Sequence, residues 1–197
     1  MSDDVQTVRT NRALKKGEKP RPPLAMQVLY ALEYVLFLGI MGLFTLLGLQ
    51  RASDFGGWLA RTLGPRIPVT RRARRNLAAA FPAMTAQERE TCIRDMWENL
   101  GRTFAEYAYL GRFSANGDDP RIIIIGMENA KAAIAKGRGG LFVSGHCGNW
   151  ELMPPCIRDL GLKGTLVYRP PNNPYVDEWI ARQRRQGLPT LAAKGGE

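Results

Sequence analysis

The fold of the C-terminal part is decided by one stretch, Leu141-Phe142-Val143-Ser144-Gly145-His146-Cys147-Gly148-Asn149-Trp150-Glu151-Leu152. Its first three residues are an apolar run that predicts a buried strand ending at Ser144-Gly145. Asn149 is a good N-cap for a following helix whose first turn contains Glu151. Ligands of α/β sheets bind beyond the carboxyl ends of the strands, so this pattern places His146 where an active site is expected.

Neighbouring segments extend the same α/β pattern. Ile122–Ile125 is a short β-branched run, Met127–Lys136 is helix-like, and Leu166–Tyr168 is a third strand candidate. Strands that alternate with helices predict a parallel or mixed α/β sheet. Three strands are too few for a sheet covered on both faces, so we assign residues 119–197 to the N-terminal part of an α/β domain that is incomplete here.

The N-terminal part combines a basic tail with an apolar segment. Residues 1–23 are polar, basic and end in prolines, which predicts a flexible tail. Residues 24–50 form the predicted membrane anchor, because a helix over Leu24–Leu49 reaches about 39 Å and a hydrocarbon core is roughly 30 Å thick. Glu33 and the short uncharged stretch leave two alternatives open, a buried core helix and a helix lying in the membrane interface. Basic residues on both flanks leave the orientation undetermined.

A helical region is predicted over residues 51–118. After Gly56-Gly57, the segment Arg66–Gly111 looks helical, and Thr85 with Glu88 forms a capping box. The helix that starts there has apolar residues at three- and four-residue spacing. An arginine cluster at 71, 72, 74 and 75 is either a solvated helix face or a lipid-facing surface, on which each cation contributes about 1 kcal/mol next to anionic lipid.

The charge and the metal-ligating residues limit the classes of function. The formal net charge is +10, which implies an anionic partner: nucleic acid, an acidic membrane surface or a phosphorylated substrate. No recognised nucleic-acid motif supports the first of these. The 3 cysteines form no even-numbered disulfide framework and lack zinc-site spacing, and a single histidine excludes a multi-histidine metal site. We therefore expect no metal or redox cofactor.

His146 carries the chemistry that the sequence suggests. Acyl transfer to a hydroxyl needs a base, and imidazole titrates near neutral pH. Glu151 can orient the imidazole and stabilise its charged form if the loop turns back, as the carboxylate does in a serine-protease triad. A lone histidine is more often structural, and this alternative remains open from the residues alone. A thiol nucleophile at Cys147 is less favoured, because direct transfer needs no covalent enzyme intermediate.

A family resemblance supports the catalytic interpretation. His146 with four residues before Glu151 matches the histidine-x4-acid motif of glycerolipid acyltransferases, and Gly145 to Glu151 resembles the lipid A biosynthesis lauroyl and myristoyl acyltransferases. The resemblance covers about Tyr30 to Gln186. Its further blocks are Arg75-Asn76-Leu77, Phe81-Pro82, Asn99-Leu100-Gly101-Arg102, Tyr168-Arg169-Pro170, Asn173-Pro174, Asp177 and Arg182–Arg185.

The resemblance implies a function and a location. It implies a glycerolipid-acyltransferase-like α/β domain that transfers a fatty acyl chain from acyl carrier protein to a hydroxyl of a lipid A precursor, on the cytoplasmic side of the bacterial inner membrane. By resemblance Arg184 and Arg169 bind anionic substrate groups, and we add Asn149 as a substrate-binding residue. The family's members are longer, so a fragment or a non-catalytic membrane-associated product is one alternative. Acylation of another glycolipid, such as a phosphatidylinositol mannoside or an ornithine lipid, is another.

Overall fold

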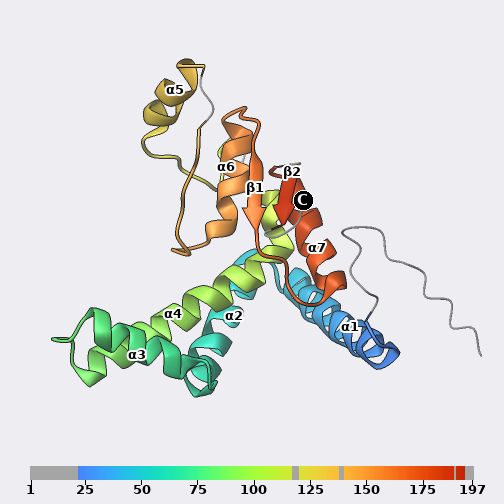
Figure 1. Cartoon of the computed structure of the whole chain (residues 1–197), viewed down its shortest axis with the longest axis vertical. Helices are drawn as coiled ribbons and strands as arrows, with labels where there is room; N and C mark the ends of the chain where they lie inside the picture. The colour runs from blue at the N-terminus through green and yellow to red at the C-terminus, as the bar shows by residue number, and fades with distance from the viewer. Residues whose placement is uncertain (1–21, 117–119, 138–139, 189, 194–197) are drawn as a thin grey trace, which may run out of the picture.

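The computed structural model describes residues 22–116, 120–137, 140–188 and 190–193, so most of the predicted basic tail lies outside the described residues. The described part is mostly helical, with a small parallel sheet near its C-terminal end (Figure 1). The elements, with 3₁₀ helices marked η, are α1 (Leu24–Leu47), α2 (Leu49–Leu63), η1 (Gly64–Arg66), α3 (Thr70–Ala80), α4 (Ala86–Glu106), η2 (Tyr107–Arg112), α5 (Met127–Ala135), η3 (Trp150–Leu152), α6 (Met153–Asp159), β1 (Thr165–Tyr168), α7 (Pro174–Arg185) and β2 (Thr190–Ala193).

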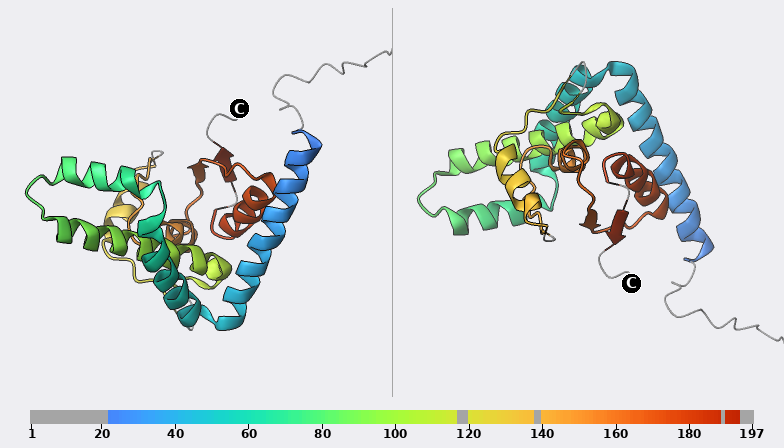
Figure 2. Two further views of the ribbon diagram at one scale, coloured as in Figure 1. Left: turned by 90° about the horizontal axis from the view of Figure 1, so that it is seen from below. Right: turned by 90° about the horizontal axis from the view of Figure 1, so that it is seen from above.

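Helix α1 is the predicted apolar helix. By length and composition it can cross a membrane, with a mean hydropathy of 1.9 over its most apolar window. It ends at Leu47 because Gly48 has φ 78°, a backbone conformation that favours glycine, and α2 starts in a new direction immediately afterwards (Figure 2). Met41 and Phe44 are buried against the rest of the chain, whereas most other apolar side chains of α1 are exposed.

The inner face of α1 is attached to the C-terminal part. The side-chain amide of Asn173, the N-cap of α7, donates to the Tyr30 carbonyl and to Glu33 Oε2, both at 2.9 Å. Phe37 stacks edge-on against Trp179 of α7 at 5.0 Å between ring centroids. The acidic residue of the apolar segment is therefore satisfied by a hydrogen bond within the protein, which lowers the cost of removing it from water.

Helices α2 and α4 approach closely because glycine lies at their contact. A Cβ atom added to Gly101 of α4 would lie 2.2 Å from the Gly56 carbonyl oxygen and 2.5 Å from the Ala60 Cβ of α2. Gly57 lies beside Arg102 in the same contact. Gly56 and Gly57 precede the segment Arg66–Gly111 that the sequence predicts as helical, yet both lie inside α2, where the absence of a side chain lets the two backbones meet.

The capping box predicted for the following helix is confirmed. The Glu88 amide donates to Thr85 Oγ1 at 3.3 Å, and the Thr85 amide donates to Glu88 Oε2 at 2.7 Å. Trp97 of this helix donates its indole N–H to Thr70 Oγ1 at 3.0 Å and thereby attaches α3 to α4. The segment Arg66–Gly111 is thus helical as predicted, and its two α-helices, α3 and α4, are separated at Phe81-Pro82.

The predicted α/β sheet is present only in small part. Thr165–Tyr168 is the strand β1, which pairs in parallel with β2 in the register Thr165↔Thr190, and α7 makes the crossover between them. The other two strand predictions, Ile122–Ile125 and Leu141–Val143, are wrong: these segments are irregular, and Ile125 and Leu141 are 93% and 88% exposed. Since a strand needs a neighbour to satisfy its backbone, an apolar run alone does not form one. The helix predicted over Met127–Lys136 is confirmed as α5.

The glycine contact between α2 and α4 gives a prediction about stability. Replacing Gly101 with Val places methyl groups where the Gly56 carbonyl already lies, so we expect a loss of about 1–3 kcal/mol of unfolding free energy or more. Gly39→Ala is the matched control, because a Cβ there meets no atom within 4 Å and Ala is the better helix former. Denaturant unfolding followed by circular dichroism measures both. Equal stability of the two variants would contradict the close contact.

Candidate functional site

The loop that carries His146 is held against α4. Its Gly148 carbonyl accepts hydrogen bonds from Asn99 Nδ2 at 3.0 Å and from Thr103 Oγ1 at 3.4 Å. Gly148 has φ 56°, in the region that favours glycine. The turn after the histidine therefore has a fixed position relative to the helical part of the chain.

Asn149 starts the next turn, as the sequence predicted. Its side-chain oxygen accepts from the Glu151 amide at 3.0 Å, which caps η3. Its side-chain amide donates to Glu106 Oε2 at 2.6 Å, and the other Glu106 oxygen accepts from Ser53 Oγ at 2.6 Å. Both ends of the Asn149 side chain are thus bonded to the protein, and its contact with substrate stays a prediction.

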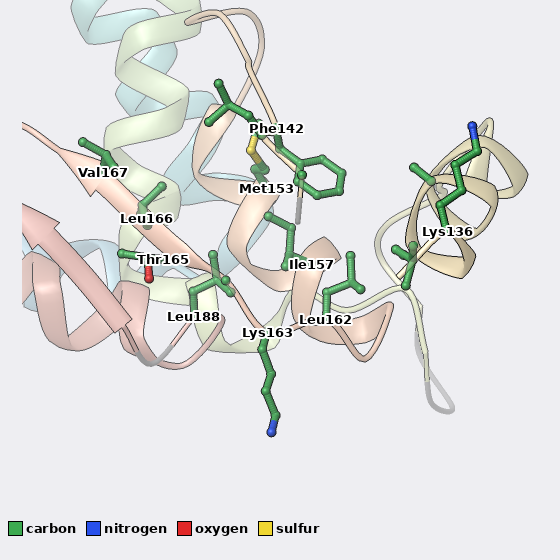
Figure 3. Close-up of a pocket in the computed structure, with 15 residues that line it drawn as sticks. Lys136, Phe142, Met153, Ile157, Leu162, Lys163, Thr165, Leu166, Val167 and Leu188 are labelled. Atoms are coloured by element: carbon green, nitrogen blue, oxygen red, sulfur yellow. The ribbon is translucent and has the colours of Figure 1, made fainter. Parts of the chain in front are cut away.

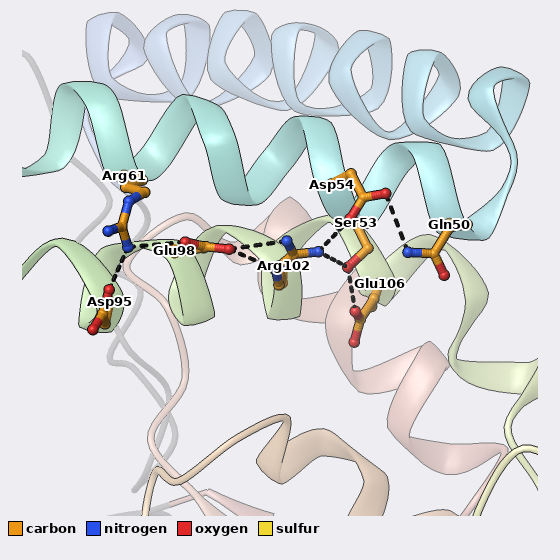
Figure 4. A network of polar contacts seen from close by, with 8 residues as sticks. All are labelled: Gln50, Ser53, Asp54, Arg61, Asp95, Glu98, Arg102 and Glu106. Carbon is orange, nitrogen blue, oxygen red and sulfur yellow. Dashed lines mark hydrogen bonds and ion pairs between the residues drawn. The ribbon is translucent and has the colours of Figure 1, made fainter.

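Glu106 lies at the end of a polar row between α2 and α4 (Figure 4). Arg102 Nη1 lies 3.4 Å from Ser53 Oγ and 2.6 Å from Asp54 Oδ1, and its Nη2 lies 2.9 Å from Glu98 Oε1. Arg61 continues the row by binding Asp95 and Glu98. Ser53 connects this row to Glu106, which also accepts the hydrogen bond from Asn149.

The buried centre of the site is an ion pair between Glu151 and Arg184. Glu151 is 3% exposed, and its two carboxylate oxygens accept from Arg184 Nε at 2.8 Å and Nη2 at 2.6 Å. Arg184 Nη2 also donates to the Tyr107 hydroxyl at 3.2 Å, and the guanidinium lies 5.2 Å from the centre of the Tyr168 ring. Two parallel hydrogen bonds make this the strongest type of carboxylate contact available to a side chain.

The environment keeps this pair charged. Burial raises the pKa of the Glu151 carboxyl, but the hydrogen bonds from Arg184, Tyr107 and Trp150, with the charge of Arg184, hold the pKa below its usual value. Burial lowers the pKa of Arg184, and the bonds to Glu151 and Tyr107 reverse this, so the net direction is upward. Burial and the nearby Glu151 charge raise the pKa of Tyr107, which stays a neutral phenol.

His146 lies beside this centre, not within it. Its side chain is exposed, and its ring meets Trp150 edge-on at 4.7 Å between centroids. The Trp150 indole N–H donates to Glu151 Oε1 at 2.9 Å. Among the described residues no hydrogen bond joins His146 to Glu151, so the expected direct contact is not formed in this structure. Trp150 links the two side chains instead, because it contacts the imidazole with its ring and the carboxylate with its N–H.

Arg169, a predicted substrate-binding residue, is not bonded to the other site residues. It is exposed directly after β1 and makes no hydrogen bond or ion pair with another described residue. Tyr107, Trp150 and Glu106 complete the site and were not predicted as functional residues. Only Trp150 had a local signal, its place inside the histidine motif; Tyr107 and Glu106 reach the site from the end of α4 and the turn that follows it.

An apolar cavity of about 560 Å³ is lined by residues that flank the histidine motif in the sequence (Figure 3). Phe142, four residues before His146, and Met153, two residues after Glu151, both line it. Ile157, Leu162, Leu166 and Leu188 form much of the rest, and the Lys136 and Lys163 side chains extend away from it in Figure 3. The cavity therefore lies between α5, α6 and β1, next to the segment that carries the histidine.

Residues 21–196 match the family model described as bacterial lipid A biosynthesis acyltransferase. The chain belongs to this family. It is 34% identical over 112 residues to the lipid A biosynthesis lauroyltransferase of Escherichia coli K12, a match that covers 54% of this chain and 34% of the relative. It is 30% identical over 115 residues to the palmitoleoyltransferase of the same organism, covering 57% and 36%. The matches thus span about a third of these relatives' length. No solved structure matches the chain.

The buried ion pair gives a prediction about stability and pH. Glu151→Gln leaves Arg184 buried without its counter-charge, so we expect a loss of about 3–5 kcal/mol of unfolding free energy at neutral pH. Because the folded-state pKa of Glu151 is lowered, its contribution is present above the ordinary value of 4.5 and is lost as the pH falls through the folded-state pKa. The difference between wild type and variant should therefore shrink in acid. Urea unfolding at a series of pH values measures it.

Glu178→Gln is the control for this experiment. Glu178 forms an exposed ion pair with Arg185 on α7, at 3.0 Å, and surface pairs contribute little. A constant difference between wild type and Glu151→Gln across the whole pH range would refute the assigned role of the ionised carboxylate.

Proposed function

We propose that this chain takes part in acyl transfer from an acyl carrier protein thioester to a hydroxyl of a lipid A precursor, at the cytoplasmic face of the inner membrane. The observation that carries the proposal is an exposed imidazole on a loop that lies beside a buried, charged Glu151–Arg184 pair. The support from relatives is that the chain belongs to the lipid A biosynthesis acyltransferase family.

In this proposal His146 is the general base. Its exposure lets an acceptor hydroxyl reach the imidazole, which removes the proton as the oxygen attacks the thioester carbonyl. The proton then returns from the imidazolium to the departing thiolate, so the step balances without a covalent enzyme intermediate. Glu151 is a positioning residue: its carboxylate, held by Arg184, accepts the indole N–H of Trp150, and the Trp150 ring in turn contacts the imidazole.

The two predicted arginines take different roles. Arg184 donates from Nε and Nη2 to the two carboxylate oxygens of Glu151. We therefore assign Arg184 to holding Glu151 rather than to binding a substrate anion. Arg169 is exposed beyond the carboxyl end of β1, where α/β sheets bind ligands. Its planar guanidinium suits a phosphate of the donor or of the glycolipid acceptor.

The apolar cavity supports the placement of the acyl chain. Its volume of about 560 Å³ lies in the range of small-molecule sites, and its lining is mainly aliphatic. Leu141 and Phe142 precede the histidine loop and line one part of it. An acyl chain in this cavity would bring its thioester end toward His146. Helix α1, which is long and apolar enough to cross a membrane, would keep this site near its lipid acceptor.

The proposal is tested by acyl transfer in membranes that contain the chain. The assay supplies a labelled acyl carrier protein thioester and a lipid A precursor. His146→Ala should lower the transfer rate by about 10²-fold or more, because general base catalysis is lost. Cys147→Ala, which changes the adjacent exposed side chain, should retain the rate. Equal transfer by wild type and His146→Ala, with equal amounts of protein in the membranes, would refute the role of the histidine.

A further inference from the structure

The outward face of α2, η1 and α3 combines exposed apolar side chains with exposed arginines. We call this surface the outer face and define it by residues of these elements and the turn between them: Phe55, Trp58, Leu63, Arg66, Ile67, Val69, Arg71, Arg72 and Arg75. Figure 1 shows α3 and the far end of α2 well apart from α6, β1 and β2. The outer face is thus separate from the candidate site.

The aromatic members of the outer face, Phe55 and Trp58, lie on the side of α2 that faces away from α4. Gly56 and Gly57 on the opposite side of α2 are buried against α4, while Trp58 is 59% exposed. Its ring stacks on Phe55 at 5.9 Å between centroids. Leu63 at the end of α2, and Ile67 and Val69 in the turn before α3, are also exposed. A helix with one packed face and one exposed aromatic face is typical of a segment that lies in a membrane interface.

The arginines of α2, α3 and α4 include paired and unpaired side chains. Arg61, Arg74 and Arg102 face neighbouring helices, and each binds a carboxylate, for example Arg74 Nε to Glu90 Oε1 at 2.5 Å. Arg71, Arg72 and Arg75 are exposed on α3 and have no hydrogen-bond or ion-pair partner among the described residues. The cations between the helices are therefore paired with carboxylates, Arg66 binds the Thr62 carbonyl, and Arg71, Arg72 and Arg75 are left available to an anion.

We infer that the outer face docks on the surface of an anionic lipid bilayer. A face with both apolar and cationic side chains fits such a surface, because the apolar groups enter the interface while the guanidinium groups bind lipid phosphates. Its position supports the same partner: α2 follows α1 directly after Gly48, and α1 exposes apolar side chains on most of its surface. The inference rests on α2 and α3 and does not depend on the proposed reaction of His146.

Docking at this face has a structural consequence. Helix α4 packs against α2 and α3, and the same helix holds the histidine loop through Asn99 and Thr103. A bilayer contact at the outer face would therefore be transmitted by rigid helix packing to the position of the candidate site.

Vesicle flotation of the whole chain tests the inference. Vesicles of phosphatidylcholine alone are compared with vesicles of phosphatidylcholine mixed with phosphatidylglycerol, because α1 alone should bind both kinds. The variant Arg71→Gln, Arg72→Gln, Arg75→Gln should reduce the preference for anionic vesicles, by about fivefold per arginine and on the order of 100-fold in total. Its matched control is Lys131→Gln, Lys136→Gln, Lys163→Gln, which removes the same charge from exposed residues elsewhere and should retain the preference.

A second measurement follows the aromatic part of the outer face. Phospholipids brominated along their chains should quench the fluorescence of Trp58, so Trp58→Phe should lose part of the quenching seen in the wild type. Thermal unfolding of each variant should match that of the wild type, because none of the replaced side chains is buried.

Three results would overturn the inference. The first is an unchanged preference for anionic vesicles in the arginine variant, and the second is an equal loss in the lysine variant. The third is a loss confined to the binding of acyl carrier protein while vesicle binding stays intact, which would make the outer face a protein-docking surface. Acyl transfer by the arginine variant reports separately on the proposed function.

Discussion

The bidentate contact between Glu151 and Arg184 is the interaction on which the C-terminal part depends. It joins η3, where the histidine motif ends, to α7, and it draws in Tyr107 from η2 and Tyr168 from β1. Two buried charges cost several kcal/mol to remove from water, and only well-aligned hydrogen bonds repay that cost. This requirement determines the geometry, because each of these four elements must bring its polar group to one point.

Helix α4 connects this centre to the helical part of the chain. On one side Gly101 lets α2 approach to backbone contact, and on another Asn99 and Thr103 bind the Gly148 carbonyl. Glu106, at its C-terminal end, receives hydrogen bonds from both Ser53 and Asn149. A single helix thus carries the packing of the helical region and the position of the histidine loop.

The contact between α1 and α7 explains how the apolar segment accommodates the acidic residue Glu33. Asn173 caps α7 with its side-chain oxygen and binds Glu33 with its side-chain amide, so one residue starts α7 and attaches it to α1. Because α7 also carries Arg184, the same attachment connects the apolar helix to the ion pair. The candidate site and the apolar helix α1 are therefore parts of one packed unit.

The sequence by itself determined the features that local chemistry specifies. The capping box at Thr85, the N-cap at Asn149, the helix α5 and the apolar helix α1 all depend on side chains a few residues apart. The motif around His146 also sufficed to indicate the family. Tertiary structure alone decided which partner each polar group takes: Glu151 binds Arg184, 33 residues away, and contacts His146 only through Trp150. It also decided which apolar runs become strands, because a strand exists only where a neighbouring chain satisfies its backbone, and spacing along the sequence does not contain that neighbour.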